Sequence, residues 1–180
     1  PGCRAEIHAH CVSLMAAEES PVLCIAIVGR DGGLLFFRSF RRSIPPDADD
    51  LELQLLLHSS LDQVEERLQS VSQALQKGEA KNFDASKADP YLGIVSPGLF
   101  DVEDCNIYGY VAGSLVKVLA IVRDGACRQR RDEEAILRSM LRQVNLLYID
   151  AASNPFYAGL GKAFASSVTR IVEQHAAAFA

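Results

Sequence analysis

The sequence predicts an α/β protein of the α+β kind: a three-layer sandwich with a mainly antiparallel five-stranded sheet and helices on both faces. Apolar and amphipathic segments follow one another in the order β-β-α-β-β-β-α-α, and short links between neighbouring strands favour antiparallel pairing. The first predicted strand, residues 22–28, is apolar at every position. A sheet with one solvated face would alternate polar and apolar residues, so helices are expected to cover both faces of this sheet.

The length and composition of the chain fit one globular domain. It has 180 residues, of which 49% are hydrophobic and 23% charged, and its net charge is −5. These values exclude a disordered chain, and the acidic balance argues against a nucleic-acid-binding protein, which normally has a basic face. Apolar runs fall well short of the roughly 20 residues of a membrane-spanning helix. Five cysteines without a C-x-x-C pair do not indicate a disulfide framework, so we expect a cytosolic protein.

The N-terminal part predicts a hairpin and then a long helix. Strands over residues 22–28 and 34–40 flank the glycine-rich turn at 31–33, where glycine supplies the positive φ of a tight turn. Leucine and valine then recur every three or four positions, which predicts one apolar face of a helix from about 49 to 77. Gly78 is the expected helix stop.

Three short strands and two helices are expected after the polar loop of residues 78–90. The strands are predicted over residues 91–95, 107–111 and 115–122. A second amphipathic helix should begin at Asp132 as its N-cap and end at Asn154-Pro155, because proline cannot continue a helix. The last helix should cover residues 161–178.

Motifs for catalysis or metal binding are weak. The segment 159–162, Gly-Leu-Gly-Lys, lacks the first glycine and the Ser or Thr of a phosphate-binding loop, so we interpret it as a link between two helices. An N-terminal cluster contains residue types that bind zinc: Cys3, His8, His10 and Cys11. Their spacing does not follow zinc patterns. His58, one step from the apolar stripe, is expected to be a partly buried structural residue. We therefore expect no catalytic, cofactor or metal site.

Two charged groups are candidates for a protein-binding surface. An acidic group lies outside the apolar stripe of the long helix and comprises Asp62, Glu65 and Glu66. It is either a solvated helix face or a docking surface for a basic partner. A basic group follows the hairpin and comprises Arg38, Arg41 and Arg42. Contact with acidic lipid or protein explains this group about as well as solubility alone does.

A third candidate is the segment Asn154-Pro155-Phe156-Tyr157. Asparagine and proline end the preceding helix, and two large aromatic residues follow directly. Either the aromatic side chains anchor the loop to the core, or they form a hot spot for a partner protein.

The segments that carry a family resemblance are, in chain order, Val22–Val28, Leu57–Glu66, Tyr91–Gly93, Tyr108–Val111, Leu137–Met140 and Asn154–Tyr157. Each is largely structural by itself, but their joint order and spacing over about residues 21–157 are specific. In these features the chain resembles the sedlin-related subunits of the trafficking protein particle (TRAPP) tethering complex, in particular the subunit 2-like group.

The resemblance implies a longin-like fold and a non-enzymatic role. The chain would be an adaptor or assembly subunit of TRAPP, which tethers vesicles and acts as a guanine-nucleotide exchange factor for Rab GTPases in ER-to-Golgi and Golgi transport and in autophagy. Its partners would be other TRAPP subunits, core and larger, with a Rab contacted indirectly. It would sit peripherally at ER and Golgi membranes through the complex. Asp62 matches the Asp of the family's Leu-Asp-x-Val motif, a surface position, which favours the docking interpretation.

The family usually begins close to its first strand, so residues 1–20 are expected to be an N-terminal extension or a tag remnant and 21–180 a single longin-like domain. Family members tend to carry proline and charged residues after Asn-Pro-Phe-Tyr, whereas residues 158–165 are mostly small and apolar here. Two alternatives stay open: a free-standing longin-type regulator that binds a SNARE or a small GTPase, and a small cytosolic enzyme with a site built across loops.

Overall fold

The computed structural model describes residues 20–41, 46–76, 90–97, 105–111, 113–124, 130–157 and 159–179. Within them, eight elements follow in the predicted order: β1 (Val22–Val28), β2 (Leu34–Ser39), α2 (Pro46–Gln76), β3 (Tyr91–Pro97), β4 (Cys105–Val111), β5 (Lys117–Arg123), α3 (Arg130–Ala152) and α4 (Lys162–Ala176). The predicted fold class is therefore confirmed.

The sheet has the strand order β2-β1-β5-β4-β3, and all four neighbouring pairs are antiparallel. β1 and β5 lie in the middle of the sheet, where Ile25 is paired with Ala120. β1 is buried at all seven positions, as its continuous apolar sequence predicts. β2 and β3 form the two edges.

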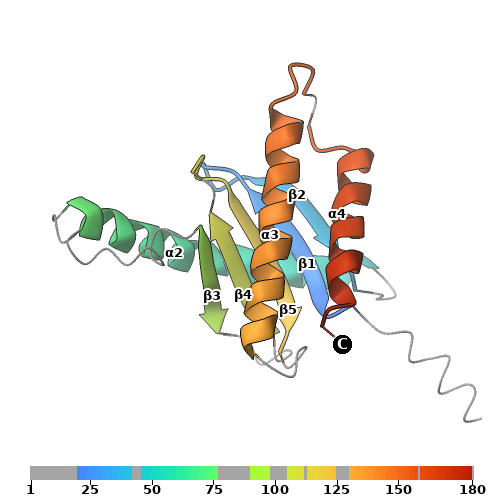
Figure 1. Ribbon diagram of the computed structural model, residues 1–180, viewed down its shortest axis with the longest axis horizontal. Coiled ribbons are helices and arrows are strands. Elements are labelled where there is room, and N and C mark those ends of the chain that lie inside the picture. The colour runs from blue at the N-terminus through green and yellow to red at the C-terminus, as the bar shows by residue number, and fades with distance from the viewer. Residues whose placement is uncertain are drawn as a thin grey trace, which may run out of the picture.

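Helices cover both faces of the sheet (Figure 1). α2 runs behind the sheet and its C-terminal end projects past β3, while α3 and α4 lie side by side in front. Side chains alternate between the faces along each strand. In β5, Val118, Ala120 and Val122 therefore join the core under α3 and α4, whereas Leu119 and Ile121 join the core under α2.

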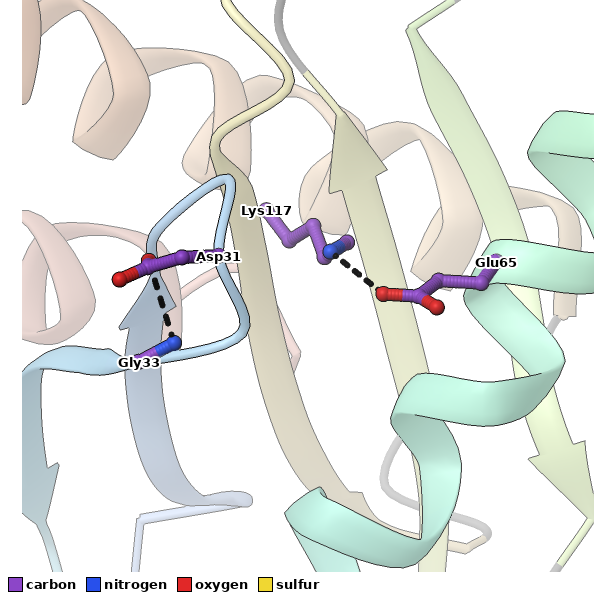
Figure 2. A network of polar contacts seen from close by, with 4 residues as sticks. All are labelled: Asp31, Gly33, Glu65 and Lys117. Carbon is purple, nitrogen blue, oxygen red and sulfur yellow. Dashed lines mark hydrogen bonds and ion pairs between the residues drawn. The ribbon is translucent and has the colours of Figure 1, made fainter.

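The β1–β2 turn has the glycine-rich chemistry that the sequence predicts. Gly32 has a φ of +81°, which glycine adopts without steric cost. Backbone hydrogen bonds link the N–H of Gly29 to the carbonyl of Gly33 at 2.8 Å and the N–H of Gly32 to the carbonyl of Gly29 at 3.1 Å. The Asp31 carboxylate also accepts a hydrogen bond from the N–H of Gly33, as Figure 2 shows.

Some predicted boundaries were wrong. The strand expected from residue 115 begins at Lys117, because Leu115 has a φ of 63°, which an extended strand does not allow. The second helix begins at Arg130, so Asp132 lies in its first turn rather than at the N-cap. An acidic residue in the first turn still interacts favourably with the helix dipole. The predicted stop at Gly78, most of loop 78–90 and the cysteine–histidine cluster at residues 3–11 lie outside the described residues.

Candidate protein-interaction surfaces

The buried side of α2 is the leucine and valine stripe predicted from the sequence. Its members that are buried against the sheet are Leu53, Leu57, Leu61 and Val64. They recur at intervals of three and four residues, so they line one side of the helix and leave the opposite side to solvent.

The solvent side of α2 combines apolar and acidic side chains. Leu51 is 70% and Leu55 62% exposed, and His58 is exposed too, so the prediction of a partly buried histidine was wrong. Asp62 and Glu66 are exposed farther along the same side. We call this surface, from Leu51 to Glu66, the outer face of α2. The physical reason for the His58 error is its position, seven residues after Leu51 and three after Leu55, which places it on their side of the helix.

Glu65 differs from its two acidic neighbours because it binds the sheet. Its Oε1 atom lies 3.1 Å from Nζ of Lys117, the first residue of β5, as Figure 2 shows. The Lys117 side chain is 4% exposed and that of Glu65 52% exposed. A buried ammonium needs a partner charge, so Glu65 ties α2 to the sheet. The acidic group thus divides into one residue engaged in the fold and two, Asp62 and Glu66, that face solvent.

The structure describes two residues of the basic group. Arg38 is exposed on the edge strand β2. Arg41 is only partly exposed, and its Nη1 atom lies 3.8 Å from Oε2 of Glu52 in α2. Arg42 lies outside the described residues. Arg38 and Arg41 are therefore in different settings, one facing solvent and the other directed to α2.

The segment Asn154–Tyr157 is a tight turn after α3. The N–H of Tyr157 donates to the backbone carbonyl of Asn154 at 3.0 Å, and the N–H of Phe156 donates to the Asn154 side-chain Oδ1 at 2.9 Å. Phe156 is 89% exposed, and Tyr157 is exposed as well. Of the two interpretations of these aromatic residues, anchoring to the core is wrong for Phe156, because its ring lies in solvent.

The described segments bear on three expectations from the sequence, which concern metal ligands, cysteine thiols and membrane spans. They contain no group of three or more His, Cys, Asp or Glu placed to hold a metal ion. Burial raises the pKa of the Cys24 thiol to about 12, so this thiol stays protonated and behaves as a small apolar side chain. None of the helices in the described part of the chain is both long and apolar enough to cross a membrane.

Sequence reasoning missed three contributors to these surfaces. Leu51 and Leu55 lie in a leucine-rich run outside the predicted buried stripe, but the sequence analysis did not single them out as exposed apolar residues. A count of leucines would have indicated them, since the run holds more apolar residues than one buried stripe needs. Lys117 was missed because its partner Glu65 is 52 residues away in the chain.

Comparison of the sequence with known proteins identifies one family. The sequence model of the sedlin family matches residues 27–175. The trafficking protein particle complex subunit 2-like protein of Rattus norvegicus is 33% identical over 135 residues, which cover 75% of this chain and 82% of the relative. The corresponding protein of Bos taurus is 32% identical over the same length, and that of Dictyostelium discoideum is 30% identical over 155 residues, 84% of this chain and 96% of the relative. The match thus begins in the last two residues of β1, spans the six described elements from β2 to α3 and ends one residue before the end of α4, and the chain belongs to the sedlin family.

Proposed function

We propose that this chain is a non-catalytic adaptor of a TRAPP-type tethering complex and that the outer face of α2 docks a larger subunit. Relatives at 30–33% identity bear the name of a subunit of the trafficking protein particle complex. In this role the chain works in ER-to-Golgi and Golgi transport and in autophagy, contacts a Rab only through the complex, and reaches membranes peripherally with it.

The observation that carries the docking proposal is the exposure of Leu51 and Leu55 next to Asp62 and Glu66 on one side of one helix. Exposed leucines contribute nothing to the core of this chain, and a partner that covers them removes apolar surface from water. The outer face of α2 is apolar at its N-terminal end and acidic at its C-terminal end. It therefore fits a partner segment that has apolar anchor residues at one end and basic residues at the other. The net charge of −5 favours the approach of such a basic partner.

Asp62→Lys tests the docking proposal. Asp62 is exposed, so the charge reversal should change the free energy of unfolding by no more than about 0.5 kcal/mol. It should, however, remove the larger TRAPP subunits that co-purify with the tagged full chain. The measurement is affinity purification from cells with identification and quantification of each TRAPP subunit, beside thermal unfolding of the purified variant.

Glu173→Lys is the matched control, because Glu173 is an exposed acidic residue on α4 and undergoes the same charge change. It should retain every subunit. Purification of the unmodified chain without any TRAPP subunit would refute the adaptor role and favour a free-standing regulator. Equal recovery with Asp62→Lys and Glu173→Lys would refute docking through the outer face of α2 but leave the adaptor role intact.

A further inference from the structure

The Asn154–Tyr157 turn has the hydrogen bonds of a preformed β-turn. Asn154 occupies the first position and Pro155 the second, and the 3.0 Å bond from Tyr157 to the Asn154 carbonyl closes the turn. The Asn154 side chain adds a second bond to the N–H of Phe156. Among the described residues other than glycine, only Leu115 has a positive φ, so Phe156 lacks the positive φ of a type II turn. Asparagine followed by proline at these positions is typical of a type I turn.

The position of the turn makes it accessible. Figure 1 shows the connection between α3 and α4 projecting beyond the ends of both helices and of the sheet. Phe156 is 89% exposed at its third position. A phenylalanine side chain buries about 150–250 Å² when a protein covers it, so this ring offers one large apolar contact to a partner.

We propose that the Asn154–Tyr157 turn is a ligand for a folded partner domain that has an apolar pocket for the Phe156 ring and polar groups at the pocket rim for the Asn154 side chain. This is the chemistry with which EH domains, small helical modules, recognise Asn-Pro-Phe turns. The partner is therefore a protein that carries such a pocket, and the contact is separate from the outer face of α2.

The shape of the turn supports a concave partner. One ring stands out from a narrow convex loop, which a flat surface would contact only at its tip, whereas a pocket would enclose it. The two turn hydrogen bonds hold the backbone before binding, so association loses less conformational entropy than with a free peptide.

The direct test is titration of the purified full chain with a purified EH domain by isothermal titration calorimetry. The unmodified chain should bind with one-to-one stoichiometry. Phe156→Ala should weaken binding at least about tenfold, the effect expected for a hot-spot side chain. Asn154→Ala should weaken it too, because it removes the bond that holds the N–H of Phe156. Thermal unfolding of both variants should match that of the unmodified chain, since both residues are exposed.

Leu51→Ala is the matched control: it truncates another exposed apolar side chain, on α2, and should leave EH-domain binding unchanged. No binding of the unmodified chain, or equal binding of Phe156→Ala, would overturn the proposal. The test is independent of the TRAPP proposal, because Phe156→Ala should still co-purify with TRAPP subunits and Asp62→Lys should still bind the EH domain. Loss of TRAPP subunits with Phe156→Ala would instead place the turn inside the complex and would also overturn the proposal.

Discussion

The two helical layers of this protein cover the same sheet in different ways. α2 alone covers one face, and the core beneath it contains aliphatic side chains and Cys24. α3 and α4 together cover the other face, where buried aromatic residues gather: Phe36, Tyr91, Tyr108, Tyr110, Phe164 and Phe179. Phe36 of β2 and Phe164 of α4 meet edge to face with ring centroids 5.0 Å apart. A single helix with a narrow buried stripe keeps a broad side exposed to solvent, and this side of α2 is the surface proposed above for a partner.

Each helical layer also makes polar side-chain contacts to the sheet, and one such contact from each layer shows a difference in exposure. On the α3 side, the Tyr108 hydroxyl donates to Oε1 of Glu133 at 2.9 Å, and both residues are buried. On the α2 side, buried Lys117 meets Glu65, whose side chain is about half exposed. The α3 contact is therefore part of a closed core, whereas the α2 contact opens onto the outer face of that helix.

The largest expected effect comes from truncating a core leucine. Leu141→Ala in α3 should lower the free energy of unfolding by about 2–5 kcal/mol, because its fully buried side chain leaves a cavity in the face covered by two helices. Leu57→Ala in α2 should cost less within the same range, since only one helix packs on that face and it can shift toward the cavity. Chemical denaturation measures both values, with exposed Leu55→Ala as control at no more than about 0.5 kcal/mol. A larger loss for Leu57→Ala than for Leu141→Ala would contradict this difference between the layers.

A smaller effect is expected from breaking the ion pair of the α2 layer. Glu65→Gln leaves the buried Lys117 ammonium without a charged partner and should lower the free energy of unfolding by about 1–3 kcal/mol, below the full cost of a buried pair because Glu65 is half exposed. Lys117→Met removes the buried charge but keeps the length of the side chain, so stability should stay equal or rise. Urea denaturation measures the free energy of unfolding of both variants. If Lys117→Met lost as much stability as Glu65→Gln, the ion pair itself would stabilise the layer, and removing the buried charge would bring no gain.

The last effect is the smallest at neutral pH, where it should be absent, and it should appear only at alkaline pH. The pKa of Cys24 is raised from 9.0 to about 12 by burial under α2, so the folded state keeps its proton where the unfolded state loses it. Stability from this group is complete below pH 9.0 and decreases as the pH rises toward 12. Cys24→Ala should reduce this alkaline decrease, measured as the melting temperature against pH. If the melting temperature of Cys24→Ala fell with rising pH as steeply as that of the unmodified chain, water would reach Cys24, and the α2 layer would be more open than the burial of this residue indicates.

Much of the fold could be predicted from the sequence because it depends on local periodicity. The continuous apolar run of β1 predicted a sheet buried on both faces, and the three- and four-residue spacing of leucine and valine predicted α2. The predicted boundary of a strand was wrong where a single residue adopts an unexpected conformation, as Leu115 does with its positive φ. The candidate surfaces were found only in part: Asp62 and Phe156 were named, whereas Leu51 and Leu55 were not.

The order of elements, the two covered faces and the family could be established without the structure, because they follow from patterns within short segments and from their order along the chain. The exposure of individual polar and aromatic residues, in contrast, became clear only from the tertiary structure. Glu65 binds Lys117 from a distant strand, whereas Asp62, three residues earlier, faces solvent. Phe156 stays in solvent because its turn projects beyond the core. Whether a side chain finds a partner within the fold depends on residues far away in the chain, and spacing along the sequence does not contain that information.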